Sequence, residues 1–340
     1  MGIGCDRNLL FIVKRVDARP TFMTTSSAPG KIILFGEHAV VYGRPALAVP
    51  VTQVHANVDV SDSARAGIWI DAPDVDLHAE VNTLPSDHPI ASVINNLFFL
   101  LRVSPFPDLE IKIASTIPVA SGLGSGAAVT VALTRALVSH LNDSMTDEEV
   151  NAFTYEIEKI HHGTPSGIDN TVITYAKPVY FVKSPSSPER RRDGGEVEIF
   201  KVGQPFTIVI ADTGISAPTR ESVGDVRRLW MNDRARWETI FDKIGEISFT
   251  ARRAIEAGKP ELLGELMNEN HALLQRLTIS SPELDGLVEA ARAAGALGAK
   301  LSGGGRGGNM IALVESEKAE TVSLSLKEAG AKNTIITRVS

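Results

Sequence analysis

Hydrophobic and polar positions along the first part of the chain follow the patterns of β-strands. The apolar run Lys31–Phe35 predicts a buried strand, and Ala46–Val51 is a second apolar segment. His55–Ser61 and Leu109–Ile113 alternate with a period of two, which predicts half-exposed strands. The chain therefore begins with a sheet.

A glycine-rich stretch, Pro118–Gly126, follows the last of these strands. Beyond it, Ala, Val and Leu recur near helical spacing from Ala128 to Leu141, so the predicted order is strand, glycine loop, helix. Thr146, followed by acidic residues, predicts the capped start of a second helix that ends near Lys159.

The second half of the chain is predicted to be rich in helix. Ser281 before Pro282 predicts a capped helix, and Gly295 ends it. The segments 299–302 and 310–314 predict two strands on either side of a glycine turn, followed by a helix near 316–329 and a strand near 334–339. The fold class is therefore α+β.

The stretch 184–195 is rich in Ser, Pro, Gly and charge, which is typical of a domain boundary. It predicts an N-terminal domain over 23–190 and a C-terminal domain over 191–340. Residues 1–22 are interpreted as an N-terminal extension, with Met23 as an alternative start. The length of 340 residues agrees with about two domains.

Composition argues against nucleic-acid-binding, membrane-spanning and disulfide-rich classes of protein. The chain has 34 Lys and Arg against 41 Asp and Glu, a net charge of −7, which argues against nonspecific nucleic-acid binding. The apolar run Leu97–Leu101 is far shorter than the roughly 18 residues of a membrane helix, so no membrane partner is expected. A single cysteine, Cys5, excludes an internal disulfide framework and predicts a reduced, cytoplasmic location.

The glycine loop is a candidate phosphate site, because backbone amides and the positive end of a following helix both attract phosphate oxygens. A simple turn is the alternative. No Gly-x-x-x-x-Gly-Lys-Ser/Thr motif is present. Gly303-x-Gly305-x-x-Gly308 matches a dinucleotide fingerprint, but a strand pattern follows it where NAD binding needs a helix.

Two acids and a lysine are candidates for the chemistry. Glu158 and Asp169 lie on either side of a Gly/Pro turn and could meet around a phosphate-bound Mg²⁺, or be two solvated carboxylates. Lys31 opens an apolar strand, where a cation needs a partner, and Asp169 suits that role. Met267 and His271 share one face of a predicted helix, which is more typical of packing.

Three regions together resemble the signature motifs of the GHMP small-molecule kinases. They are Pro29–Lys31 with Gly36–His38, the loop Pro118–Ala128, and Lys300–Gly305. Within that superfamily, the stretch His162–Asn170 resembles the mevalonate kinases in particular. The resemblance extends over residues 24–340.

The resemblance implies a ribosomal-protein-S5-like N-terminal domain, a ferredoxin-like C-terminal α/β sandwich, and a cleft between them. There ATP would phosphorylate the C5 hydroxyl of (R)-mevalonate, a step of isoprenoid precursor synthesis. Asp169 would be the base or orienting carboxylate, with Lys31 as its cationic neighbour. Glu158 and Ser125 would hold Mg²⁺.

The resemblance also implies which residues bind the two substrates. Those that would bind ATP are Pro118, Ser121, Gly122, Leu123, Gly124, Ser125, Gly126, Ala127, Gly303, Gly304 and Gly305. Those that would bind the acceptor are Glu37, His38, Ser166, Gly167 and Asp169. For His38, a purely structural role is the alternative.

Two positions depart from the family pattern. Gly126 stands where the family loop commonly has a second hydroxyl, so Ser125 or a water would serve the metal. Arg306 interrupts a glycine run, either as a phosphate contact or as a surface residue. Another acceptor (phosphomevalonate, homoserine or a sugar), a non-catalytic metabolite sensor and a homodimer all stay open.

Overall fold

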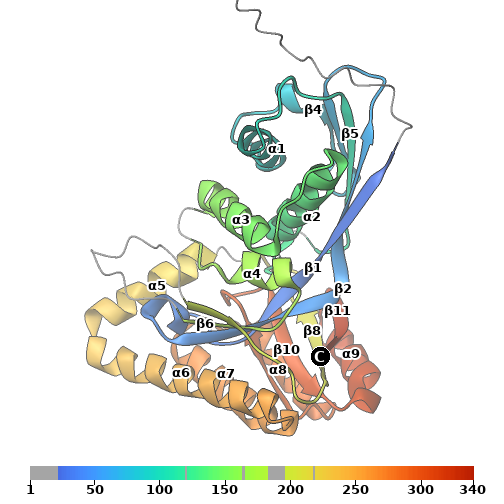
Figure 1. Cartoon of the computed structure of the whole chain (residues 1–340). Coiled ribbons are helices and arrows are strands. Elements are labelled where there is room, and N and C mark those ends of the chain that lie inside the picture. The colour runs from blue at the N-terminus through green and yellow to red at the C-terminus, as the bar shows by residue number, and fades with distance from the viewer. Residues whose placement is uncertain (1–21, 119–120, 163–164, 183–195, 217–218) are drawn as a thin grey trace, which may run out of the picture.

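The structure, a computed structural model, describes residues 22–118, 121–162, 165–182, 196–216 and 219–340. It has two α+β halves, one above the other in Figure 1. The upper half contains a seven-stranded sheet in the order β4-β3-β5-β2-β6-β7, with β1 paired to β2. These strands are β1 (Thr24–Phe35), β2 (Pro45–Asp62), β3 (Ile68–Ala72), β4 (Leu77–Glu80), β5 (Leu109–Ser115), β6 (Val179–Val182) and β7 (Glu196–Ile199).

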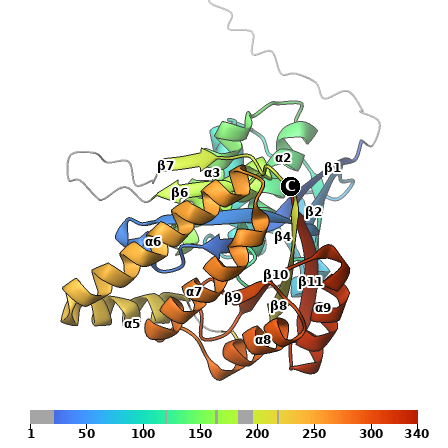
Figure 2. The same cartoon turned by 90° about the horizontal axis from the view of Figure 1, so that it is seen from below.

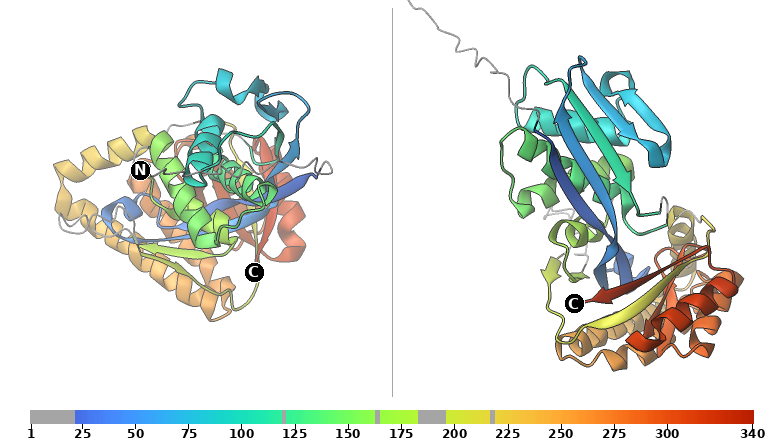
Figure 3. Two further views of the ribbon diagram at one scale, coloured as in Figure 1. Left: turned by 45° about the horizontal axis from the view of Figure 1, so that its top comes forward. Right: turned by 90° about the vertical axis from the view of Figure 1, so that its right-hand side faces the viewer.

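Strand β2 organises this sheet, because it pairs with β1, β5 and β6. The apolar segment Ala46–Val51 and the alternating segment His55–Ser61, which the sequence presents separately, are parts of this one strand of 18 residues. Its pairing with β1 jumps from Gly30↔Val51 to Pro29↔His55, so the residues between Val51 and His55 form a bulge. Figure 3 shows β1 and β2 running from the upper half into the lower half.

The helices of the upper half cover one face of the sheet. They are α1 (Pro89–Leu100), α2 (Ser125–His140), α3 (Asp147–His162) and α4 (Ile168–Tyr175). Helix α2 packs on β1 and β2, as its almost wholly apolar inner face requires. The predicted cap of α3 is confirmed: Glu149 N donates to Thr146 Oγ1 at 3.2 Å, and Thr146 N donates to Glu149 Oε2 at 2.7 Å.

The lower half is built on an antiparallel four-stranded sheet in the order β11-β8-β10-β9. Its strands are β8 (Phe206–Asp212), β9 (Gly298–Ser302), β10 (Asn309–Val314) and β11 (Asn333–Val339). Its helices are α5 (Thr219–Asn232), α6 (Arg234–Glu256), α7 (Leu263–Arg276), α8 (Pro282–Ala293) and α9 (Ala319–Glu328). Helices α7 and α8 pack against β9, and α9 packs against β8 and β11 (Figure 2).

The stretch 303–308 joins β9 to β10 as the turn of an antiparallel hairpin. No helix follows it, so the structure agrees with the sequence in giving no support to NAD binding there. The predicted cap of α8 is also confirmed, since Leu284 N donates to Ser281 Oγ at 3.3 Å. The helix predicted near 316–329 begins with a 3₁₀ turn at Ser316–Lys318 and becomes α-helical at Ala319.

Most of the predicted N-terminal extension, 1–21, and the predicted boundary stretch 184–195 lie outside the described residues. Strand β7 follows that stretch and still belongs to the first sheet, whereas β8 begins the second. The division at residue 190 stays a prediction. Among the described helices, none has the length and apolar character needed to cross a bilayer.

Helix α7 and strand β9 approach each other backbone to backbone. A Cβ atom on Gly298 would lie 2.0 Å from the carbonyl oxygen of Gly264. We therefore expect Gly298→Ala to lower the free energy of unfolding by about 3 kcal/mol, because the helix must move away from the sheet. Urea denaturation measures this loss.

Gly286, inside α8, is the matched control, since a Cβ there meets nothing within 4 Å. Gly286→Ala is expected to leave stability unchanged or raise it by about 0.5–1 kcal/mol. Equal unfolding midpoints for Gly298→Ala and the parent would contradict the close approach.

Candidate active site

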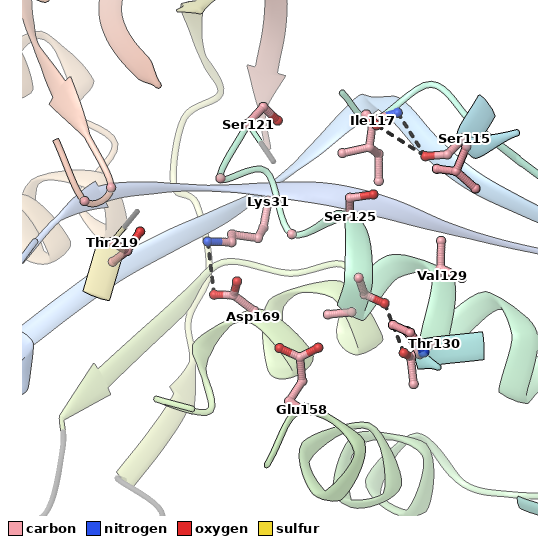
Figure 4. A pocket seen from close by; sticks show the side chains of 18 of the residues that line it. Lys31, Ser115, Ile117, Ser121, Ser125, Val129, Thr130, Glu158, Asp169 and Thr219 are labelled. Carbon is pink, nitrogen blue, oxygen red and sulfur yellow. Dashed lines mark hydrogen bonds and ion pairs between the residues drawn. The ribbon is translucent and has the colours of Figure 1, made fainter. Parts of the chain in front are cut away.

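A cavity of about 890 Å³ lies where the two halves meet (Figure 4). Lys31 of β1, Asp169 of α4 and the start of α2 border it from the upper half. The turn at Gly303 and Gly304 borders it from the lower half. The cavity thus brings together the three regions that the sequence singled out.

Lys31 and Asp169 form an ion pair at the wall of the cavity, with 3.0 Å between Nζ and Oδ1. The Lys31 side chain is 6% exposed and that of Asp169 is 36% exposed. Gly167, in the left-handed conformation (φ 88°), precedes α4 and turns the chain so that Asp169 lies in the first turn of the helix. The predicted convergence of these two side chains is confirmed.

The glycine loop folds against Lys31. Gly122 and Gly124 both have φ of 78°, which favours glycine. A Cβ on Gly124 would lie 2.7 Å from Ile173 Cδ1 and 3.0 Å from Lys31 Cγ. The loop leads directly into α2, so loop residues and the positive end of a 16-residue helix border the cavity.

Glu158 projects from α3 toward the space between Asp169 and the first turn of α2, where Ser125 lies (Figure 4). A Cβ on Gly126 would lie 3.8 Å from Glu158 Oε1. The missing side chain at 126 therefore leaves room beside this carboxylate. Carboxylate and hydroxyl oxygens are ligands that Mg²⁺ prefers.

His38 joins the two halves at the cavity wall. Its Nε2 lies 3.0 Å from the Gly304 carbonyl oxygen, to which it donates, and Nδ1 is buried. Burial lowers the pKa of His38 to about 4, since a charged imidazole would be poorly solvated there. His38 is therefore a neutral donor at neutral pH.

Glu37 has a different environment from the one its predicted role implies. The residue borders the cavity, but its side chain is fully buried, and its carboxylate pairs with Lys300 of β9. Asn270 Nδ2 donates to the other carboxylate oxygen at 3.2 Å. Burial lowers the pKa of Lys300, and the Glu37 carboxylate opposes that shift. Both carboxylate oxygens are thus engaged in contacts between the halves rather than facing an acceptor.

Two further side chains of the β9–β10 hairpin reach the upper half. Ser302 Oγ donates to the Ile33 carbonyl oxygen at 2.7 Å. Asn309 Nδ2 donates to the carbonyl oxygen of Ser121 in the glycine loop. With Lys300 and Gly304, this hairpin supplies four polar contacts to the upper half.

Arg306 does not border the cavity, and its side chain is engaged by the lower half. Its guanidinium pairs with Asp225 of α5, and Nε donates to the Thr278 carbonyl oxygen at 3.3 Å. The residue has φ of 61°, a left-handed conformation that glycine adopts more readily. Arg306 therefore ties the glycine turn to α5.

Most of the predicted site residues border the cavity, and five do not. Leu123 is buried, and its carbonyl oxygen accepts from Lys31 N at 2.9 Å. Ser166 and Gly167 shape the start of α4, since Ser166 Oγ accepts from Ile168 N at 3.3 Å.

The other two residues are Pro118 and Gly305. The carbonyl oxygen of Pro118 accepts from Ser121 Oγ at 2.8 Å, and Gly305 packs against the Ile279 carbonyl. These five support the walls instead of forming them.

Some residues that line the cavity were not predicted from the sequence. Thr219 and Val223 of α5 border the cavity near Gly304, and Ala72, Asp74–Leu77 and His88–Ile90 border another part of it. None of these residues belongs to a recognisable motif, so the sequence carried no signal for them. In the predicted stretch His162–Asn170, Gly163 and Thr164 lie outside the described residues.

Comparison with known proteins identifies this arrangement. The N-terminal domain model of the GHMP kinases matches residues 90–177, and the C-terminal model matches residues 251–332. The mevalonate kinase of Pyrococcus abyssi is 35% identical over 337 residues, covering 94% of this chain and 96% of the relative. That of Methanocaldococcus jannaschii is 31% identical, covering 88% and 95%.

Solved structures of kinases have the same fold as this chain. L. major mevalonate kinase, in complex with R-mevalonate, matches with a TM-score of 0.80 and 30% identity, covering 95% of this chain and 98% of that one. Streptococcus pneumoniae phosphomevalonate kinase, at 20% identity and a TM-score of 0.77, shares the fold.

The chain therefore belongs to the GHMP kinases, two-domain enzymes of the kind that the sequence motifs indicated. Its similarity to the Pyrococcus and L. major enzymes extends over nearly the whole of each chain, and it places this chain with the mevalonate kinases. The predicted family and fold are confirmed.

A second buried histidine makes stability depend on pH. His271 of α7 accepts from Leu301 N through Nδ1 at 3.3 Å, and Nε2 lies 3.1 Å from Asp285 Oδ1. Burial lowers its pKa to about 4, and protonation of Nδ1 would also break the bond to β9. Between pH 6.5 and about 4 the unfolded state therefore binds more protons, and the free energy of unfolding decreases as the pH is lowered through this range.

The free energy of unfolding of the parent should fall between pH 7 and pH 4.5. We expect this fall to be about 1–2 kcal/mol smaller in His271→Gln, because the variant lacks the titrating group. Urea denaturation at each pH measures the difference. His78→Gln, at a site where the side chain is 70% exposed, is the control and should keep the parent's slope. Parallel slopes for parent and His271→Gln would refute the assignment.

Proposed function

We propose that this chain transfers the γ-phosphoryl group of ATP to the C5 hydroxyl of (R)-mevalonate, supplying phosphomevalonate for isoprenoid precursor synthesis. The observation that carries this proposal is the Lys31–Asp169 ion pair beside the glycine loop, in a chain that matches mevalonate kinases along its length. Phosphoryl transfer depends mainly on positioning and charge neutralisation, and this cavity offers groups for both.

The phosphates of ATP belong at the glycine loop. Amides from Ser121 to Ala127 and the start of α2 attract their oxygens, and Lys31 adds a positive charge. The adenosine end would lie toward α1, where Ile90, Val93 and Ile117 provide apolar walls. A cavity of about 890 Å³ lies within the size range of small-molecule sites and leaves space for the acceptor.

Asp169 would orient the acceptor hydroxyl. Its carboxylate borders the cavity, paired with Lys31, and can accept the hydroxyl hydrogen bond so that the oxygen faces the γ-phosphorus. Lys31 would stabilise the charge on the transferred group. The carboxylate therefore orients the nucleophile and receives its proton.

Mg²⁺ would be held by Glu158 and Ser125 together with phosphate oxygens. Among the described residues, no three His, Cys, Asp or Glu side chains are grouped so that they could hold a metal themselves. This agrees with a magnesium ion bound through few protein ligands and the nucleotide. When bound, the ion would neutralise charge on the phosphates.

A cytoplasmic location and the lack of a nucleic-acid or membrane partner stay predictions, and a homodimer stays a possibility. The small-molecule partners, ATP and mevalonate, follow from the function proposed above.

A coupled assay of ADP release tests the acceptor. With ATP and Mg²⁺, we expect turnover with mevalonate and at least about a hundredfold lower kcat/KM with phosphomevalonate, homoserine or galactose, because these would leave groups in the site unpaired. ADP release with mevalonate would exclude a non-catalytic sensor. Preferential turnover of another acceptor would assign the chain to a different GHMP activity.

Asp169→Asn tests the mechanism. We expect kcat to fall about 10²–10⁴-fold, since the amide cannot take the proton, while the Kd for ATP changes less than about threefold. Asp147→Asn is the control, because Asp147 also pairs with a cation, Arg135 at 2.6 Å, but lies at the start of α3. A normal kcat for Asp169→Asn would remove this residue from the chemistry.

A further inference from the structure

We propose that Asn309 is a positioning residue for the ATP phosphates, because from the lower half it holds the glycine loop of the upper half. The inference rests on the proposed function, in which that loop binds ATP. Asn309 itself does not border the cavity and acts through the loop.

The backbone of Asn309 is fixed by the sheet. It is the first residue of β10, paired with Ser302 of β9 and with Asp212 of β8, and it is 2% exposed. Its Nδ2 donates to the carbonyl oxygen of Ser121. A Cβ on Gly122 would lie 4.0 Å from the same nitrogen. The amide therefore supports the first residues of the loop directly.

Two points of the loop, Ser121 and Leu123, are held from different halves. Lys31 N donates to the Leu123 carbonyl oxygen at 2.9 Å, which fixes the middle of the loop to β1. Ser121 Oγ donates locally, to the Pro118 carbonyl oxygen at 2.8 Å. Within the described part of the chain, Asn309 thus supplies the side-chain bond that connects Ser121 to the other half.

The other amide atom of Asn309 argues against a role in stability alone. Oδ1 is buried and has no hydrogen-bond partner among the described residues. A buried acceptor without a partner costs stability, and leucine would fill a similar volume without that cost. An asparagine at this position is explained by its donor, which acts on the loop.

This geometry links nucleotide binding to the docking of the two halves. The loop amides can face the phosphates only while Ser121 stays in place, and Asn309 holds Ser121 only while β10 lies against the loop. Affinity for ATP should therefore depend on a residue that never touches it.

Asn309→Leu tests the inference, because it removes the donor and keeps the volume. We expect the Kd for β,γ-imido-ATP with Mg²⁺, measured by calorimetric titration, to rise about three- to tenfold, the effect of one lost hydrogen bond. The KM for ATP should rise in parallel, with the KM for the acceptor and the melting temperature little changed.

Ser302→Ala is the matched control. Ser302 belongs to the same hairpin and donates to the Ile33 carbonyl oxygen at 2.7 Å, so the variant loses a bond between the halves without touching the loop. We expect it to keep the parent's nucleotide Kd while its melting temperature falls by a few degrees.

An unchanged nucleotide Kd in Asn309→Leu, or an equal rise in both variants, would overturn the proposal. If the leucine variant does not fold, Asn309→Ala removes the same donor and is judged by the same outcomes. Because the titration needs no acceptor, failure of the proposed function would appear as absent mevalonate turnover with this affinity difference intact.

Discussion

A lysine within a buried strand is tolerated only where a carboxylate compensates its lost hydration, and the active-site geometry of this chain follows from that demand. Lys31 lies in β1, so its partner had to come from a turn that brings an acid to the sheet. The glycine at 167 makes that turn. The same strand holds the glycine loop through its backbone, so the cation, the acid and the loop are fixed relative to one another.

The sequence predicted the features that depend on neighbouring residues. The strand, glycine loop and helix around 109–141, the caps at Thr146 and Ser281, and the hairpin at 303–308 are all local, and the structure has them. The Lys31–Asp169 pair was also predicted, because a lysine in an apolar strand needs a carboxylate partner and Asp169 suits that role.

The rest depends on contacts between distant residues. Glu37 was predicted to face the acceptor, but Lys300, far along the chain, engages its carboxylate. Arg306 was ambiguous until Asp225 proved to be its partner. The two segments of β2 seemed separate because the bulge opposite Pro29 interrupts the apolar pattern while the strand continues. The spacing of residues along the sequence does not predict such contacts between distant residues.

The Glu37–Lys300 pair has a consequence for how the molecule could be divided. Each half contributes one charge of this pair, and both side chains are fully buried. If the halves were separated, each fragment would expose its charge to water. If they reassembled imperfectly, the charge would be buried without a partner, and an unpaired buried charge costs several kcal/mol. The two halves are therefore not independent modules: exchanging one of them would also require a matching partner for the remaining charge.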